Sequence, residues 1–145
     1  MTNQFIIREF KESDRSYICR TVLFNMLQLD SHAQRINKDS FLTGHNKVIN
    51  SILNYAKCLV ICDPVESNLL YGFIIFETRG EFDMIHYAYI RKDFRGLGLL
   101  KNIVDIVKTK KNLSISHTNS EIKPAKLKKY WDKVIFDCYT VIKER

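Results

Sequence analysis

The chain has 145 residues, about the size of one domain, and carries a formal net charge of +7. Hydrophobic residues make up 46% of it and charged residues 27%, a balance that excludes a disordered chain and suffices for a packed core. No apolar run reaches the roughly 18 residues of a membrane span, and the first residues lack the basic and apolar regions of a signal peptide. We therefore expect a soluble cytoplasmic protein that makes no membrane contact.

The charge is distributed unevenly along the chain. Residues 1–90 carry a net charge of −1, whereas residues 91–145 carry +8. One interpretation is a positive face for coenzyme phosphates, nucleic acid or an acidic substrate. The other is a lysine-rich surface that keeps the protein in solution. Charge alone leaves both interpretations open.

The four cysteines, Cys19, Cys58, Cys62 and Cys138, show none of the paired spacings of a zinc site. Cys58 and Cys62 lie in an apolar run of strand type, where a free thiol behaves as a small hydrophobic side chain. Disulfides belong mainly to secreted proteins, and the sequence shows no secretion signal. We expect neither a metal nor a disulfide.

The first part of the chain predicts a strand followed by helices. The apolar run 5–10 has the length of a strand, and Ser13 or Asp14 is a suitable cap for a helix after it. Apolar residues then recur every three or four positions up to Leu29, which predicts one amphipathic helix. A second helix is expected over 47–55, after a polar stretch.

The middle of the chain predicts three strands. The apolar segment 58–62 is one, and the segments 69–78 and 82–90 follow it. The last two form an antiparallel hairpin, because only the short turn 79–81 separates them. Gly72 lies inside the first hairpin strand, where a glycine indicates a bulge or a close backbone approach.

A basic loop with glycines connects the strand 82–90 to a helix that begins near Leu99. Glycines at such a turn leave the first N–H groups of the helix accessible, and the helix dipole adds partial positive charge there. Arg91, Lys92 and Arg95 add whole charges to the same loop. This combination predicts a cradle for phosphate or pyrophosphate, although an ordinary strand-to-helix connection also uses glycine.

The last part of the chain predicts a strand over 113–116 that is parallel to the strand before the loop, which completes a β-α-β unit. Pro124 suits the first turn of a further helix that would carry Tyr130 and Trp131. The run 134–141 is a final strand. No linker, repeat or low-complexity segment is present, so we expect a single α/β domain over residues 1–145.

The segment 95–100, Arg-Gly-Leu-Gly-Leu-Leu, follows a strand that ends at Ile90. It resembles motif A of the GCN5-related N-acetyltransferase (GNAT) superfamily, which is Arg/Gln-x-x-Gly-x-Gly/Ala after such a strand. Arg95 and Gly98 match the motif, and Leu100 stands where the family has Gly or Ala. The resemblance implies a mixed, mainly antiparallel central sheet flanked by helices, and the predicted order of elements agrees with it.

The resemblance also implies a cosubstrate, acetyl-CoA or another acyl-CoA, and no metal. In the family, the amides of the loop bind the pyrophosphate of the coenzyme, and the edge of the preceding strand pairs with the pantetheine amides where two parallel strands part. The positions that would bind the coenzyme are Ala88, Ile90, Arg91, Arg95, Gly96, Leu97, Gly98, Leu99 and Leu100.

The reaction implied is direct transfer of the acyl group to an amine, which needs a base for the amine and an acid for the departing thiolate. His86 is the only histidine on the strand before the loop and is the candidate base, with Glu77 and Asp83 as alternatives. Tyr130 is the candidate acid, one position from Trp131, where the family pattern would place a tyrosine. The alternative for His86 and Tyr130 is structural packing.

Two other functions are compatible with the sequence. Some members of the superfamily resemble the Mom DNA-modification proteins, which act on adenine, and the basic second part of this chain fits a nucleic-acid partner. Tyr87, Tyr89, Tyr130 and Trp131 would then be candidates for stacking on bases, although core packing explains them as well. The other alternative is a catalytically inactive GNAT-like binding module.

Overall fold

The computed structural model of the chain describes residues 5–29, 35–95, 98–117 and 127–137. Its described part contains one sheet of six strands in the order β1-β2-β3-β4-β5-β6. The strands are β1 (Ile6–Glu9), β2 (Lys57–Cys62), β3 (Leu70–Arg79), β4 (Phe82–Ile90), β5 (Asn112–Ile115) and β6 (Lys133–Phe136). β1 to β4 are antiparallel, whereas β5 is parallel to β4 and β6 is parallel to β5. The expected mixed, mainly antiparallel α/β sheet is confirmed.

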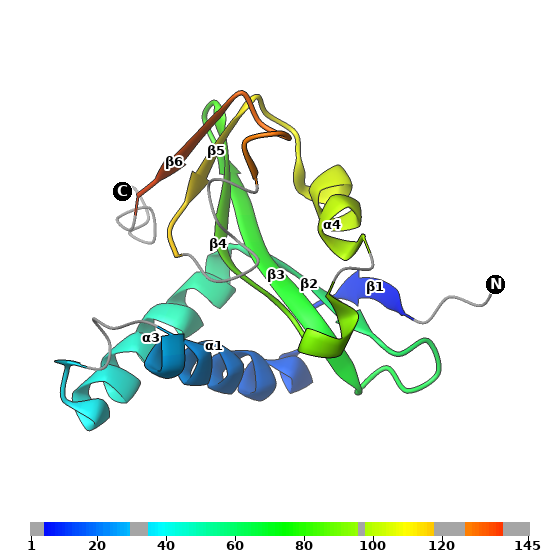
Figure 1. Cartoon of the computed structure of the whole chain (residues 1–145). Helices are drawn as coiled ribbons and strands as arrows, with labels where there is room; N and C mark the ends of the chain where they lie inside the picture. Colours follow the sequence, from blue (N-terminus) through cyan, green and yellow to red (C-terminus); the bar gives the residue numbers. More distant parts are fainter. Residues whose placement is uncertain (1–4, 30–34, 96–97, 118–126, 138–145) are drawn as a thin grey trace.

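The helices form a layer on each face of the sheet (Figure 1). α1 (Arg15–Leu29) and α3 (Lys38–Tyr55) lie next to each other and pack on β2, β3 and β4 through one hydrophobic cluster. α4 (Leu99–Val107) packs on the opposite face, against β3, β4 and β5, through a second cluster. None of the helices in the described residues is long and apolar enough to span a membrane.

α3 is longer than the sequence pattern predicts. It begins at Lys38, nine residues before the expected start at Lys47, and both end at Tyr55. The Asn37 side chain caps it by accepting a hydrogen bond of 3.0 Å from the Ser40 N–H. The extra turns also bury Phe41. Apolar periodicity missed them because the only large apolar residues of this part, Phe41 and Leu42, are adjacent and give no helical spacing.

Gly72 has the role that its position in a strand predicts. It pairs with Ile90 on β4, and the register between β2 and β3 shifts opposite it, between Ile61 and Cys62. A side chain at Gly72 would collide with the carbonyl oxygen of Tyr89. Glycine therefore allows β3 to approach the carboxyl end of β4 closely.

Several predicted elements are only partly described. Pro124, with the beginning of the helix expected there, lies outside the described residues, and so does the last predicted strand beyond Asp137. Among the described cysteines, Cys19, Cys58 and Cys62 are free and buried. Within the described ranges, no group of His, Cys, Asp and Glu side chains could hold a metal ion.

Candidate active site

The loop between β4 and α4 contains a short 3-10 turn, η2 (Lys92–Phe94), and Gly98 at the start of the helix. Gly98 has φ 78° and ψ 10°, a left-handed conformation that favours glycine. The first turn of α4, which includes Leu99 and Leu100, contains no acidic residue. The amides at this helix end therefore have the dipole and the local charge that suit an anion. Gly96 and Leu97 lie outside the described residues.

Aromatic packing anchors this loop to the sheet. The ring of Phe94 stacks on Tyr71 of β3 with a centroid separation of 4.0 Å. The Tyr71 hydroxyl donates a hydrogen bond of 2.7 Å to Asp63, in the turn before β3. The Arg91 N–H donates to the Tyr71 carbonyl at 2.7 Å. These contacts hold the start of the loop beside the end of β4.

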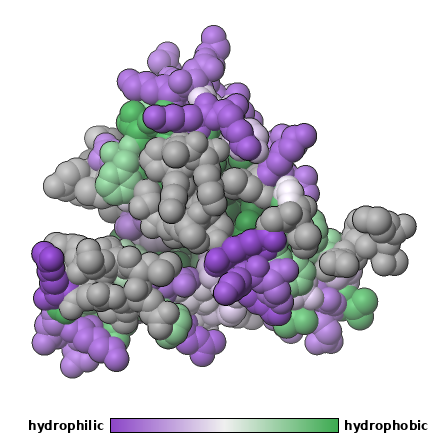
Figure 2. All heavy atoms as spheres, in the orientation of Figure 1, coloured by the Kyte–Doolittle hydropathy of each residue, from purple (hydrophilic) through white to green (hydrophobic). Residues whose placement is uncertain are grey.

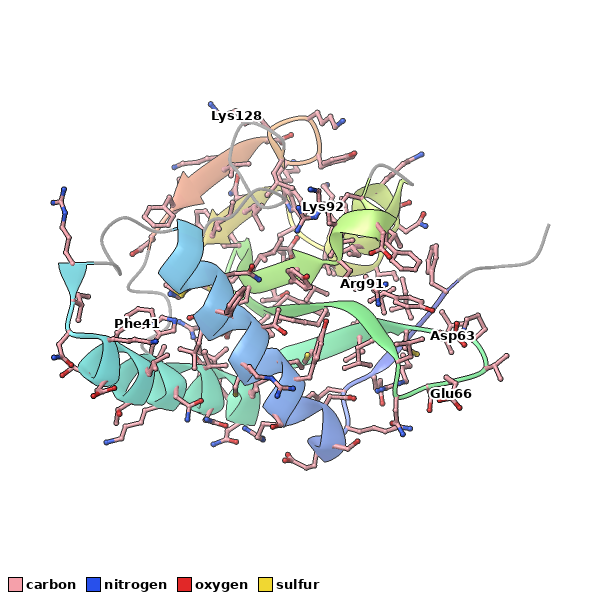
Figure 3. All side chains as sticks on the ribbon, turned by 60° about the horizontal axis from the view of Figure 1, so that its bottom comes forward. Phe41, Asp63, Glu66, Arg91, Lys92 and Lys128 are labelled. Atoms are coloured by element: carbon pink, nitrogen blue, oxygen red, sulfur yellow. The ribbon has the colours of Figure 1, made fainter. Side chains whose placement is uncertain are left out.

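The arginines of the loop make contacts within the protein. Arg91 forms an exposed ion pair with Asp93 at 2.6 Å, so its charge is partly offset. The Arg95 Nε donates to the Ile90 carbonyl at 2.8 Å, and its guanidinium lies over the Tyr89 ring. Figure 3 shows Arg91 and Lys92 beside the end of β4 and the start of α4. The loop is thus basic, but Arg95 is folded back onto β4.

β4 and β5 stop pairing near the middle of β4, and we call this position the fork. The ladder joins Phe82–Ile85 to Asn112–Ile115, and the Ser116 N–H still donates to the Ile85 carbonyl at 3.1 Å. β4 then continues for five residues to Ile90, beyond the ladder with β5. A cofactor arm lying along β4 would extend from the fork toward Gly98.

A bulge in β4 determines which side chains face α3 at the fork. Ile75 of β3 pairs with Tyr87 and the next residue, Phe76, pairs with Ile85, so His86 is an extra residue. Because of this bulge, His86 and Tyr87 project from the same face of the sheet although they are adjacent in the chain. Both rings make edge-on contacts with rings of α3, His86 with Tyr55 and Tyr87 with His45.

His86 and Glu77 form a hydrogen-bonded pair that we call the buried pair after its buried histidine, although the Glu77 side chain is 14% exposed. The His86 side chain is fully buried, and its Nε2 lies 2.6 Å from Glu77 Oε2. Arg79 donates to both oxygens of Glu77. Burial lowers the pKa of His86, and the adjacent Glu77 carboxylate offsets this only in part. Burial opposes ionisation of Glu77, but the hydrogen bonds from Arg79 and His86 outweigh it and lower the pKa of Glu77.

Three rings meet just past the fork, and we call His45, Tyr87 and His117 the histidine cluster. The Tyr87 hydroxyl lies 2.6 Å from His45 Nε2 and 3.1 Å from His117 Nε2. The rings of Tyr87 and His117 stack at 4.2 Å. His45 stacks on Phe41 at 5.3 Å, which orients it toward the sheet. The two histidines are half-buried, whereas Tyr87 is buried and its pKa is raised by that burial.

Ser116 connects the histidine cluster to the buried pair. Its Oγ lies 3.0 Å from His86 Nδ1 and 2.8 Å from His117 Nδ1. It also lies 3.3 Å from the His86 carbonyl. A continuous chain of hydrogen-bonding groups therefore runs from α3, past the fork, to the β3–β4 hairpin. Of its members, the sequence pattern predicts only His86 and Glu77 for proton transfer, because the contacts of His86 with Ser116 and of Tyr87 with His45 join distant segments.

Comparison by sequence finds no match to any protein-family model or curated protein. Comparison by structure does find neighbours. A candidate acetyl transferase from Pyrococcus furiosus matches with a TM-score of 0.63 and 17% identity, over 86% of this chain and 89% of that one. A candidate acetyltransferase from Clostridium difficile 630 matches with a TM-score of 0.52 and 18% identity, over 88% of each chain.

A GNAT family acetyltransferase from Brucella melitensis, solved in complex with acetyl-CoA, matches with a TM-score of 0.51 and 10% identity, over 82% of this chain and 79% of that one. This chain has the GNAT fold. The resemblance seen in segment 95–100 is thereby confirmed at the level of the fold, since identities this low show no more than that.

Within the GNAT fold, the position implied for a catalytic tyrosine is held by Trp131. Its indole N–H donates a hydrogen bond of 3.0 Å to Asp83 Oδ2. Tyr130 packs beside it, just before β6 begins at Lys133. Since β6 and β5 are parallel, Tyr130 lies at their amino ends, whereas the fork lies at the carboxyl end of β5. The structure does not bring Tyr130 together with His86.

Asp83, an alternative for the base, has a different environment. It is fully buried and accepts hydrogen bonds from Trp131, from the N–H groups of Thr109 and Lys110, and from the Thr109 hydroxyl. Burial opposes its ionisation, but these donors outweigh that and lower its pKa. A carboxylate with its oxygens so fully engaged holds segments together and is poorly placed to accept a further proton.

Six exposed lysines lie at the end of the β4–β5 ladder that contains Asp83. We call the exposed side chains around the end of α4 and the starts of β5 and β6 the lysine group. It consists of Lys108, Lys110, Lys111, Lys128, Lys129 and Lys133. Figure 2 shows hydrophilic side chains at this end of the molecule, and Figure 3 places Lys128 apart from Arg91 and Lys92. Much of the positive charge after residue 91 therefore lies away from the cradle.

Proposed function

We propose that this chain is one acyl-CoA-binding domain over residues 1–145 and transfers an acetyl or other acyl group from acyl-CoA to an amine. The observation that supports this best is the placement of two features side by side. β4 extends beyond its ladder with β5, and α4 begins beyond the end of that extension at a left-handed glycine. The GNAT fold and the acetyl-CoA complex of one structural neighbour agree with it.

The coenzyme would lie along the extended part of β4. Its pyrophosphate would meet the amides from Gly96 to Leu100, and its pantetheine arm would run along Ala88 and Ile90 toward the fork. The acyl group would then lie close to the histidine cluster. Since Arg95 contacts the Ile90 carbonyl in this structure, its guanidinium would share that oxygen or turn toward the coenzyme.

His86 is the proposed base, because Glu77 orients its ring and its pKa is lowered. A neutral imidazole can accept the proton that an ammonium substrate must lose. Tyr130, the other predicted catalytic residue, lies at the far end of β5, whereas Tyr87 places a phenol just past the fork. We therefore propose His86 and not Tyr130 for proton transfer.

Calorimetric titration with acetyl-CoA tests coenzyme binding. Lys101→Glu reverses a charge in the first turn of α4, and we expect it to weaken binding about tenfold, which equals about 1.4 kcal/mol. A negative charge there favours the helix dipole, so a loss of affinity would not come from unfolding of the helix. Lys108→Glu, at the other end of α4, is the matched control and should bind as the wild type does.

Two outcomes would overturn the proposal. Absence of heat at millimolar acetyl-CoA would rule out the coenzyme, and equal affinities for Lys101→Glu and Lys108→Glu would rule out the site. Substitution of Gly98 is a poorer test, because any side chain there is strained by the positive φ. Binding without transfer to any member of a panel of amines would favour the inactive binding module.

The lysine group is the one observation that favours a nucleic-acid function. Binding of duplex DNA through these lysines would weaken steeply with salt, because each contact releases counterions. A Mom-like enzyme would also need the target base at the fork, on the opposite end of β5 from the lysine group. Salt-independent DNA binding, or none, would exclude this alternative. A steep salt slope that Lys110→Glu reduces would support it.

A further inference from the structure

The base proposed above has no direct access to a substrate, which raises the question of how a proton reaches it. His86 is fully buried, and its two ring nitrogens face Glu77 and Ser116. The Tyr55 ring packs edge-on against His86, and the charge of Arg79 acts on it as well. A proton taken from an amine at the fork must therefore travel through other side chains.

The hydrogen-bonding groups allow one consistent arrangement of hydrogens when the histidines are neutral. Ionised Glu77 can only accept, so His86 carries its hydrogen on Nε2 and accepts at Nδ1. Ser116 then donates to His86 Nδ1 at 3.0 Å in preference to the carbonyl at 3.3 Å. With its one hydrogen used, Ser116 accepts from His117, whose Nδ1 must carry the hydrogen.

The same assignment of hydrogens extends to His45 on α3. His117 has its hydrogen on Nδ1, so its Nε2 accepts from the Tyr87 hydroxyl. The Tyr87 oxygen in turn accepts from His45 Nε2–H at 2.6 Å. The opposite orientation would leave His117 Nδ1 and Ser116 Oγ facing each other at 2.8 Å without a hydrogen between them. Every hydrogen in the chain therefore points from His45 toward Glu77.

We propose that the histidine cluster and the buried pair are the two ends of one proton relay, joined through Ser116. The proposal rests on the acyl-transfer function above and names the route of the amine's proton. A proton taken up by the His45 ring releases the Nε2 hydrogen to Tyr87, and the Tyr87 hydrogen passes to His117. The His117 Nδ1 hydrogen passes to Ser116, and the Ser116 hydrogen to His86.

The relay conserves protons and charge. Each intermediate group gains one proton and loses one, and the net result is an imidazolium at His86. That cation is held between Glu77 and Ser116, and the Glu77 carboxylate remains ionised beside Arg79. Ser116 and His117 act here as positioning residues for proton transfer, since the substrate would meet the relay at its outer end.

Nuclear magnetic resonance of protein labelled with 15N-histidine tests the arrangement without substrate or coenzyme. At a pH where the rings are neutral, we expect His45 and His86 to carry hydrogen on Nε2, and His117 to carry it on Nδ1, the tautomer that imidazole disfavours in water. Single His→Gln variants assign the signals. His117 observed as the Nε2–H form, or His86 observed with both nitrogens protonated, would overturn the proposal.

The rate at which His86 gains and loses its titrating proton tests the transport itself. We expect Ser116→Ala to lower this rate at least tenfold, as seen from line broadening near the midpoint of the titration, and Ser116→Thr to restore it. Ser114→Ala is the matched control, since Ser114 is a buried serine of β5, two residues before Ser116, whose Oγ has no hydrogen-bond partner in the described residues.

The outcomes distinguish a failure of the relay from a failure of the proposed acyl-transfer function. Equal rates in Ser116→Ala and Ser114→Ala would overturn the relay even if acetyl-CoA binds. Failure of acetyl-CoA to bind, with the tautomers and rates as expected, would overturn the acyl-transfer function and leave the relay as a property of the fold.

Discussion

The two ends of the short ladder between β4 and β5 differ sharply in how their polar groups are used. At the amino end, Asp83 is a buried carboxylate surrounded by donors from Thr109, Lys110 and Trp131. At the carboxyl end, the strands separate and half-buried titratable rings meet around Tyr87. One end holds the strands together by saturated hydrogen bonding, and the other keeps groups that can exchange protons.

This difference teaches how a carboxylate and a histidine on one strand come to have separate roles. Asp83 and His86 are three residues apart on β4, and both are fully buried. The donors around Asp83 include two backbone N–H groups, the Trp131 indole and the Thr109 hydroxyl, and all of them point their hydrogens at the carboxylate. The partners of His86 are a carboxylate and a hydroxyl, which can pass protons. Burial alone therefore does not distinguish the structural group from the proposed catalytic one.

The largest expected effect is loss of stability on breaking the amino end. Asp83→Ala would leave the buried indole N–H of Trp131 and the N–H groups of Thr109 and Lys110 without their acceptor, at about 1–3 kcal/mol each. We expect the free energy of unfolding to fall by about 3 kcal/mol or more. Urea denaturation measures it, with Asp93→Ala, at an exposed ion pair, as the control expected within about 0.5 kcal/mol of wild type. A small loss in Asp83→Ala would contradict the assigned role.

The next effect concerns the close approach of β3 to the carboxyl end of β4. Gly72→Ala would force Tyr89 and Ile90 to move, and we expect a loss of about 1–3 kcal/mol of stability. Weaker acetyl-CoA binding should accompany it, because the displaced residues line the proposed pantetheine path. Gly44→Ala is the control, since this α3 position has open space and should gain up to about 1 kcal/mol. If Gly72→Ala bound acetyl-CoA as tightly as the wild type does, the pantetheine arm would not run along this part of β4.

A smaller effect is the pH dependence that the buried pair adds to stability. The pKa of His86 is lowered in the folded protein from its ordinary value of 6.5. Below pH 6.5 the unfolded chain therefore binds a proton that the folded chain does not, and stability falls as pH decreases toward the folded pKa. The corresponding loss for Asp83 begins only below its ordinary value of 3.8, since its pKa is also lowered. We expect His86→Gln to lose less stability than wild type between pH 7.5 and 5 in urea denaturation. An identical loss would show that His86 is not held neutral.

The smallest effect is expected at the lysine group. Lys110→Glu and Lys111→Glu change exposed charges, so stability should stay within about 0.5 kcal/mol of wild type. Acetyl-CoA affinity should also be unchanged at 0.15 M salt, because the four residues of β5 span roughly 13 Å, beyond the Debye length of about 8 Å. A loss of affinity as large as that of Lys101→Glu would show that the two ends act as one binding surface.

Much of the fold was predictable because its signals are local. The hairpin and the strand-loop-helix unit from 82 to 107 follow from apolar runs, short turns and Gly98, and the structure places these elements where the pattern does. The extension of α3 was not predictable from apolar periodicity, because it depends on the cap at Asn37 and on the burial of Phe41, which periodicity does not show.

The candidate site was predictable only where chemistry and local sequence coincide. His86 lies on the strand before the loop, and its residue type suggests a base. His45 belongs to the part of α3 that periodicity missed, and Ser116, just past β5, attracts no notice in the sequence until its contacts with His86 and His117 are seen. The contacts of Ser116 with His86 and of Tyr87 with His45 join segments 30 and 42 residues apart, which no spacing rule describes.

The bulge at His86 has a consequence for insertions and deletions in β4. Side chains of a strand alternate between the two faces of the sheet, and the extra residue shifts this alternation by one position. Asp83 and Ile85, before the bulge, therefore share a face with Ala88 and Ile90, after it. Removing one residue there would turn the beginning of the strand over. Met84 would then point toward α4, and the carboxylate of Asp83 would point away from Trp131. The length of this strand is therefore as strictly constrained as the identity of its residues.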